Sequence, residues 1–514
     1  MVTAATPAAD WLVVAPVVVT ILAGSVLVML RSFPRLQPII AIAAMAVLVL
    51  SNSLLLVRVA AEGPLTMTMG RWLPPFGISF SADVLGATLS LTASVVALAV
   101  AVYGVRDVPS GLRRFGFYPC LVLMMAGVSG AFLTGDVFNL YVWFEVLLIA
   151  SFGLIVLGNG REQLDGAIRY AILNLLATTL FLIAVGYLYG LTGTLNMADI
   201  AGRLREMGDI APINTIAALF ILAFAMKAAA FPVNFWLPAS YHTPMISVAA
   251  LFAGLLTKVG VYALLRVIVM LMPEQRSIYA DVLAAVAIAT MLIAGLGAVA
   301  QSDLRRMLGY FVITGIGAMI AGLALGTQLA LAGATFYAVH SMIVSAALYL
   351  GVGLAGRVGR SFDSRALGGI YARAPWLSAV FLVLVFAIAG LPPFSGFWPK
   401  VLITEAALEQ GRWILAASVL LSGFLTTIAG GRAFALSFWR GGPLGTPDGT
   451  SDEAALARLP AGETVWLLAP MAFLAALAVL IGLWPDTLMT LADASALALL
   501  DPSAYVRSVF GGSP

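Results

Sequence analysis

The chain has 514 residues, of which 62% are hydrophobic and only 10% are charged. Soluble globular proteins are about half apolar and about a quarter charged. The composition therefore excludes a soluble enzyme, a disordered chain and a coiled coil, and it predicts a polytopic membrane protein. The net charge of +3 comes from cations spread over many connections, which does not suit a nucleic-acid-binding surface.

Apolar runs recur along the whole chain. Because a membrane-spanning helix needs about 20 apolar residues, these runs predict an all-α protein with about 14 spans. The runs cover residues 11–30, 38–60, 83–104, 116–134, 137–158, 167–191, 212–230, 246–272, 279–300, 307–325, 329–355, 376–390, 412–436 and 464–485.

The connections between the runs set the topology. Residues 65–83 alternate and carry Gly and Pro-Pro, which predicts an extracytoplasmic hairpin. Residues 441–461 are polar and rich in Gly and Pro, which predicts a surface loop, and residues 485–514 read as a weakly amphipathic tail. Arginines gather in the odd-numbered connections, so the positive-inside rule places those connections in the cytoplasm and both termini outside.

A weak internal repeat links the seventh and twelfth spans. Phe-Ala and Phe-Trp pairs at 224–225 and 235–236 recur 162 residues later, and both copies flank helix-breaking prolines (Pro232; Pro392 and Pro393). Because the copies are five spans apart, they lie inverted in the membrane, which is typical of secondary transporters. The chain therefore divides into an N-terminal unit (1–114), two inverted five-helix repeats (115–272 and 278–438), and a final loop, span and tail (439–514).

Glu145 and Lys227 are the first candidates for function. Glu145 is the one carboxylate near the middle of a predicted span, where charge is costly and by default functional. Lys227 precedes the break at Pro232, and irregular backbone at that depth must be buried or line a wet cavity. A lysine can release its proton whereas an arginine does not, so the two residues form a candidate proton site. A structural ion pair, or a lysine reaching to the membrane surface, are the alternatives.

Three further isolated ionisable groups lie within apolar stretches. They suit a proton relay and are Lys258, His340 and Lys400. The only lysines in the sequence are Lys227, Lys258 and Lys400, and none of them lies in a polar connection. For His340, a hydrogen-bonded packing residue is the alternative.

Two residues near the ends of spans are candidates for proton access or gating. His242 lies in the turn after the seventh span, where it either controls access or caps a turn. Asp136 opens the fifth span, where an N-cap is the alternative.

No cofactor or metal site is expected. A single cysteine, Cys120, allows neither a disulfide nor a cysteine-ligated cluster within the chain. The glycines at 351, 353 and 356 match GxGxxG but end an apolar helix rather than following a strand, so helix packing explains them better than a dinucleotide.

Five segments resemble the proton-translocating antiporter-like membrane subunits shared by respiratory complex I and Mrp-type cation/proton antiporters. They are FEV at Glu145, MKAAAFPVNFWLPASYHTP from Met226, LLTKVGVYALLR from Leu255, QSDLRRMLGY from Gln301 and GLPPFSGFWPK from Gly390. MGRWLPPFGISFSAD from Met69 is most similar to the D-type branch of the Mrp complexes. The resemblance implies two inverted five-helix bundles and a polar chain across the membrane's middle. The family's relay positions would be Glu145, Lys227, Lys258 and Lys400.

The first functional interpretation is a subunit of a multisubunit Na⁺(K⁺)/H⁺ antiporter in the plasma membrane. It would work with other subunits and conduct protons through Glu145, Lys227, Lys258, His340 and Lys400. Because a hard cation prefers several oxygen ligands, one mid-membrane carboxylate indicates that the cation path lies partly in a partner. The alternative is a proton-pumping subunit of a complex I-like or hydrogenase-like membrane arm. A membrane enzyme is disfavoured, since no nucleophile–base pair is evident.

Overall fold

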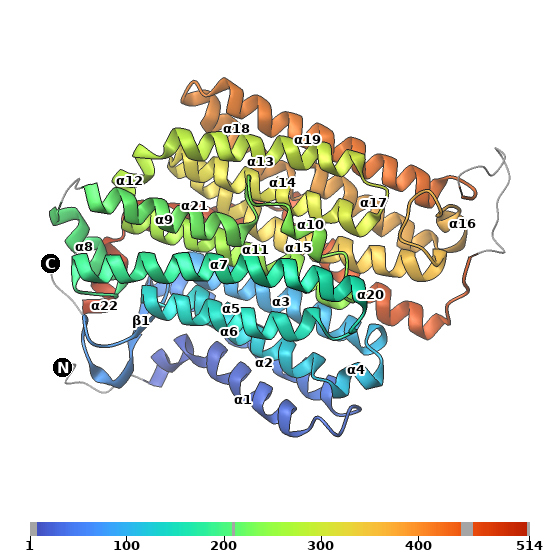
Figure 1. Cartoon of the computed structure of the whole chain (residues 1–514), viewed down its shortest axis with the longest axis horizontal. Coiled ribbons are helices and arrows are strands. Elements are labelled where there is room, and N and C mark those ends of the chain that lie inside the picture. The colour runs from blue at the N-terminus through green and yellow to red at the C-terminus, as the bar shows by residue number, and fades with distance from the viewer. Residues whose placement is uncertain (1–7, 208–210, 444–455, 511–514) are drawn as a thin grey trace.

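The computed structural model describes residues 8–207, 211–443 and 456–510. Its helices run nearly side by side along one axis (Figure 1). The first half consists of η1 (Ala8–Val13), α1 (Ala15–Met29), α2 (Gln37–Glu62), β1 (Leu65–Thr68), η2 (Met69–Arg71), β2 (Ser79–Ala82), α3 (Val84–Asp107), α4 (Ser110–Arg114), α5 (Phe117–Leu133), α6 (Val137–Ile155), α7 (Arg161–Thr192), α8 (Met197–Met207), α9 (Ala211–Ala228), α10 (Trp236–Ser240) and α11 (Ile246–Leu264).

The second half continues in the same all-α manner. It consists of the π-helix η3 (Leu265–Leu271), α12 (Pro273–Ile278), α13 (Ala280–Ala300), α14 (Leu304–Leu325), α15 (Gln328–Gly359), α16 (Ile370–Arg373), α17 (Pro375–Ala389), α18 (Phe397–Glu409), α19 (Trp413–Phe434), the π-helix η4 (Ala435–Trp439), α20 (Ala461–Leu483), α21 (Asp486–Leu500) and α22 (Ser503–Phe510). Much of the predicted surface loop at 441–461 lies outside the described residues.

The predicted polytopic all-α fold is confirmed. The described residues contain ten helices that are long and apolar enough to cross a membrane, and four shorter apolar helices of 10–17 residues. The count of 14 spans stays a prediction. The apolar windows of α11 and α15 are fully buried, whereas that of α7 is 39% buried, so α11 and α15 form the centre of the bundle and α7 lies at its periphery.

The two halves share a pattern that explains the internal repeat. An unbroken helix of 32 residues, α7 in the first half and α15 in the second, precedes each interrupted helix. The interrupted pairs are α9–α10 and α17–α18, which confirms the breaks that the prolines predicted. The domain boundaries proposed from the sequence remain a prediction.

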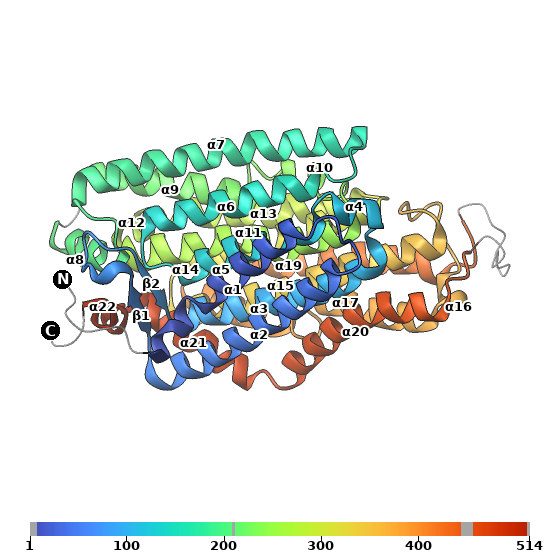
Figure 2. The ribbon, with the colours of Figure 1, turned by 90° about the horizontal axis from the view of Figure 1, so that it is seen from below.

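The region after the last predicted span is more ordered than a tail. Residues 486–510 form α21 and α22, and α21 packs on α15 and α3 while α22 packs on β1. In Figure 2, α20 and α21 follow one another along the bundle. The helix interruption at Trp484–Pro485 made the last apolar run look complete, so the sequence analysis missed the buried face of α21, which includes Ala492 and Ala496.

The predicted hairpin is present as antiparallel strands β1 and β2, with Leu65 opposite Ala82. Directly after β2, Asp83 caps α3 by accepting a hydrogen bond from the Gly86 N–H at 2.9 Å. The same carboxylate receives both terminal nitrogens of Arg266 at 2.6 and 2.7 Å, and each side chain is only 1% exposed. This bidentate pair fixes the hairpin end of the first half to η3.

At the opposite end, one arginine joins helices of both halves. Arg357 of α15 contacts Asp107 of α3 at 3.0 Å and Glu463 of α20 at 2.7 Å. Asp107 also accepts hydrogen bonds from the backbone and the hydroxyl of Ser247, at the start of α11. The network therefore fixes the position of α11, which carries Lys258.

We expect Arg266→Met to destabilise the protein strongly. The change leaves Asp83 as a buried carboxylate without its counter-ion, which costs about 3–5 kcal/mol. The matched control is Arg58→Met, because Arg58 pairs with Asp10 and Glu62 but its side chain is 22% exposed, and such pairs contribute about 0–1 kcal/mol. Thermal unfolding of the purified protein measures both, and equal midpoints would show that the buried pair adds nothing.

Candidate functional site

Each interrupted helix turns through a left-handed residue. Ala229 follows α9 with a φ of 62°, and Gly390 follows α17 with a φ of 83°. Left-handed backbone costs a residue with a Cβ roughly 1–2 kcal/mol, so Ala229 stores strain next to Lys227. At Gly390 an added Cβ would lie 2.6 Å from Lys400 Cδ and 2.8 Å from its Nζ, so glycine makes room for the lysine.

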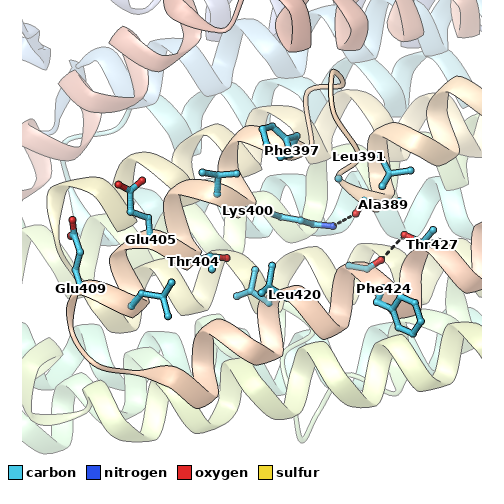
Figure 3. A pocket seen from close by; sticks show the side chains of 15 residues that line it. Ala389, Leu391, Phe397, Lys400, Thr404, Glu405, Glu409, Leu420, Phe424 and Thr427 are labelled. Atoms are coloured by element: carbon cyan, nitrogen blue, oxygen red, sulfur yellow. Dashed lines mark hydrogen bonds between the residues drawn. The ribbon is translucent and has the colours of Figure 1, made fainter.

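Lys400 binds the backbone that the second break leaves open. Its Nζ donates to the carbonyl of Ala389 at 2.5 Å and to that of Ile388 at 3.3 Å (Figure 3). These are the last carbonyls of α17, which have no partner inside their own helix. A cation at a helix C-terminus also interacts favourably with the helix dipole. Lys400 therefore stabilises the end of α17 at the break between α17 and α18.

A cavity of about 720 Å³ surrounds Lys400 between α18 and α19. Figure 3 shows the lysine reaching towards Ala389, away from Glu405 and Glu409, which lie further along α18. Both carboxylates line the cavity, and both are exposed. The sequence analysis missed them because they lie at the end of an apolar half-helix rather than in its middle, although the spacing of one helical turn between them was visible.

Lys227 and Glu145 lie near each other without forming a direct ion pair. The lysine is 5% exposed, and its Nζ lies 4.8 Å from the centre of the Phe144 ring. Among the described residues its ammonium has no hydrogen-bond acceptor, and Glu145 Oε1 is likewise buried and unpaired. Glu145 is close enough for its charge to act on Lys227. The predicted pair is thus separated in this structure.

Lys258 lies at the centre of the bundle, where it is 1% exposed. Its Nζ donates to the carbonyl of Ala253 at 2.6 Å. One half-turn further along α11, an added Cβ on Gly260 would lie 2.9 Å from the backbone nitrogen of Ala228. This close approach of α11 to the end of α9 puts the Lys258 segment directly beside the Lys227 segment.

His340 connects the central helix α15 to the second break. Its ring is fully buried, and Nδ1 lies 2.8 Å from the hydroxyl of Ser395, between α17 and α18. Nε2 is buried and has no partner among the described residues. The charges of Lys258 and Lys400 both act on the ring. The hydrogen-bonded packing that was the alternative therefore accounts for only one of its two nitrogens.

His242 belongs to a separate group at the end of the bundle where α10 meets α14. Its Nδ1 contacts the carbonyl of Pro238 at 2.8 Å and its Nε2 contacts Arg306 at 3.1 Å. Because a carbonyl only accepts and an arginine only donates, these contacts assign the neutral tautomer with its proton on Nδ1. Burial first, and the charge of Arg306 next, lower the pKa of His242. No local sequence pattern pointed to its partner, Arg306.

Asp136 has the structural role that was its alternative. It caps α6 by accepting a hydrogen bond from the Asn139 N–H at 2.7 Å. Burial is the main cause that raises the pKa of Asp136 to about 6. Its part in proton access stays a prediction.

Paired interrupted helices with buried ionisable side chains define an ion-translocating membrane protein of the secondary-transporter class. Residues 134–426, more than half of the chain, match the family described as "NADH:quinone oxidoreductase/Mrp antiporter, TM". The chain belongs to this family, as the resemblance predicted.

Similar proteins share nearly the whole length of the chain. The D subunit of a Na(+)/H(+) antiporter from Alkalihalophilus pseudofirmus is 37% identical over 97% of this chain and 99% of its own. That of Bacillus subtilis is 34% identical, again over 97% and 99%. Among solved structures, a chain of the Mrp complex from Dietzia sp. DQ12-45-1b has a TM-score of 0.87 at 29% identity, with 98% and 99% covered. A chain of respiratory complex I from Thermus thermophilus has a TM-score of 0.81 at 25% identity, with 95% and 100% covered.

We expect Gly390→Ala to impair the site more than its backbone strain explains. The new methyl would displace Lys400 from the Ala389 carbonyl. The matched control is Gly411→Ala, because Gly411 has a similar φ of 68° but no atom within 4 Å of an added Cβ. Both variants should lose stability in thermal unfolding, Gly390→Ala more than Gly411→Ala because it also displaces Lys400, whereas only Gly390→Ala should lose ion transport. Equal transport by the two would mean that the position of the ammonium does not matter.

Proposed function

We propose that this chain is a subunit of a multisubunit Na⁺(K⁺)/H⁺ antiporter in the plasma membrane, and that protons cross it through Glu145, Lys227, Lys258, His340 and Lys400. It is a transporter subunit rather than a catalytic enzyme. The identity of 37% with the D subunit of an antiporter, against 25% with the complex I chain, favours an antiporter over the membrane arm of a redox-driven pump.

The observation that carries the proposal is that all three lysines of the chain are buried within the helix bundle. Lys227 is 5% exposed, Lys258 is 1% and Lys400 is 8%. Not one of them forms an ion pair with a carboxylate among the residues described. An unpaired buried ammonium is costly, so a purely structural role does not account for it. A group that alternately holds and releases a proton explains why lysine is retained.

The arrangement supports a path in segments. Lys227 lies at the first break with Glu145 of α6 near it, Lys258 lies beside this break in the centre, and His340 connects the centre to the second break through Ser395. Lys400 then faces the large cavity lined by Glu405 and Glu409. Backbone carbonyls hold Lys258 and Lys400 but take up no proton, so each transfer needs water or a neighbouring side chain. The monovalent cation would pass partly through another subunit, because Glu145 is a single mid-membrane carboxylate.

The direct test is ion exchange by the whole complex in vesicles that lack endogenous antiporters. An imposed Na⁺ or K⁺ gradient should drive proton movement in the opposite direction with no electron donor present. Vesicles with a complex assembled without this subunit provide the control. Proton movement that requires a reductant and ignores the cation gradient would instead favour the redox-driven alternative.

We expect Lys227→Arg to reduce transport to nearly the level of Lys227→Ala. Arginine keeps the charge, so a structural role would tolerate it, but arginine does not release its proton at accessible pH. Glu145→Gln should abolish transport as well. Transport rate against pH is the measurement, with assembly checked on native gels. A Lys227→Arg variant that transports at the wild-type rate would remove proton exchange by this lysine from the mechanism.

The same substitution tests the second break. Lys400→Arg could retain contacts with the carbonyls of Ile388 and Ala389, since guanidinium is also a donor. We expect this variant to assemble with normal thermal stability and to lose transport. Normal transport would confine Lys400 to stabilising the end of α17.

A further inference from the structure

Lys227 differs from the other two lysines in what surrounds its ammonium. Lys258 and Lys400 donate to backbone carbonyls, whereas Lys227 has no acceptor among the described residues. Its side chain lines a small cavity of about 20 Å³ between α6, α7 and α11. A buried donor that has no acceptor in the protein and whose side chain lines a cavity needs a partner there.

The cavity has the size and polarity of a site for one water molecule. A buried water needs roughly 10–15 Å³ of space for its centre and 2–4 polar partners. Besides Lys227, the cavity is lined by Tyr170 and Asn174 of α7, which are 2% and 6% exposed. Trp236 also lines it, but its ring nitrogen already donates to the Met226 carbonyl at 3.1 Å. Three polar groups thus remain to hold a water.

The hydrogen bonds around Tyr170 fix which way such a water is oriented. Ser151 donates its single proton to the Leu148 carbonyl at 2.7 Å. The Ser151 and Tyr170 oxygens are also 2.7 Å apart, so in this second contact Tyr170 must donate. The tyrosine oxygen is left with acceptor capacity only. Asn174 uses its amide nitrogen on the Tyr170 carbonyl at 2.9 Å, which leaves its Oδ1 as an acceptor.

We propose that this cavity is a binding site for one water, which accepts a hydrogen bond from Lys227 Nζ and donates to Tyr170 and to Asn174 Oδ1. Each hydrogen bond then has one donor and one acceptor along the series that runs from Lys227 through the water, Tyr170 and Ser151 to the Leu148 carbonyl. Tyr170 is a positioning residue, because it acts on Lys227 through the water. The next step rests on the proposed function: when Lys227 releases its proton, this water accepts it.

The surroundings of Lys227 make its transport role sensitive to this water. The titratable groups that face it are Glu145 of α6 and Tyr170 of α7, while α10 and α11 present Trp236 and Leu256. A water that accepts a hydrogen bond favours the charged form of an amine. When the water is lost, the alkaline limb of the transport profile should therefore move to lower pH.

The test is Tyr170→Phe, which removes the hydroxyl and keeps the ring packed on Trp236 and Phe252, at centroid distances of 5.5 and 5.9 Å. We expect assembly to be normal, transport to fall several-fold, and the alkaline limb to shift to lower pH. Tyr103→Phe is the matched control, because Tyr103 is fully buried and its hydroxyl donates to the Leu350 carbonyl at 3.2 Å. An unchanged rate and profile for Tyr170→Phe, or the same change in Tyr103→Phe, would overturn the proposal.

Two further measurements keep the test independent of one variant. Asn174→Leu, of similar size, removes the second acceptor and should produce the same shift. A density map of the complex that resolves ordered water should show one between Lys227, Tyr170 and Asn174, and a map with Lys227 bonded directly to Glu145 there would contradict it. If Lys227→Ala transports normally, the proposed function fails. If Lys227→Ala is inactive while Tyr170→Phe and Asn174→Leu behave like the wild type, only the water site fails.

Discussion

Every polar backbone group at membrane depth must find its partner inside the protein, because the hydrocarbon offers none. The two interrupted helices violate this requirement locally and depend on other residues to restore it. At the first break, the Met226 carbonyl receives Trp236 and the Phe231 N–H reaches the hydroxyl of Thr290 on α13. At the second, the terminal carbonyls of α17 receive Lys400. At the second break, a buried lysine is therefore the group that satisfies the irregular backbone.

The two breaks satisfy this requirement in different ways, and their lysines therefore have different hydrogen-bond partners. Lys227 precedes its break, where the Met226 carbonyl accepts hydrogen bonds from the Ala229 N–H and from Trp236, and the lysine side chain lines a cavity instead. Lys400 follows its break and is itself the donor. The two breaks thus have similar backbones but different side-chain contacts. Lys400 donates to backbone carbonyls, whereas the ammonium of Lys227 has no acceptor among the described residues.

Much of the fold and part of the site could be predicted from the sequence. Composition and apolar runs indicate the helices, and Pro232, Pro392 and Pro393 indicate the breaks, because these are local properties of the chain. The buried lysines were also evident, since a charge within an apolar run is costly wherever the run packs. Helix α21 was missed because the break at Trp484–Pro485 ended the last apolar run before it.

Pairings between distant helices could not be predicted, because no local pattern encodes them. Arg266 lies within a predicted span and Asp83 at the edge of another, yet nothing in their spacing shows that they meet. The contacts of His242 with Arg306 and of Tyr170 with Ser151 are of the same kind. The separation of Glu145 from Lys227 is subtler, because it depends on a few ångströms of side-chain placement that only the packed bundle determines.

The C-terminal helix α22 has a consequence for how the protein is made. Ser508 hydrogen-bonds Thr66 of the hairpin at 2.8 Å, and the Tyr505 ring lies 5.4 Å from the Arg266 guanidinium beside Asp83. The hairpin leaves the ribosome well before these partners, because Ser508 follows Thr66 by 442 residues. This end of the bundle therefore stays incomplete until α22 has been synthesised, and until then Thr66 and the Arg266–Asp83 pair lack their contacts with α22. A chain that stops before α22 would leave this polar surface of the hairpin uncovered.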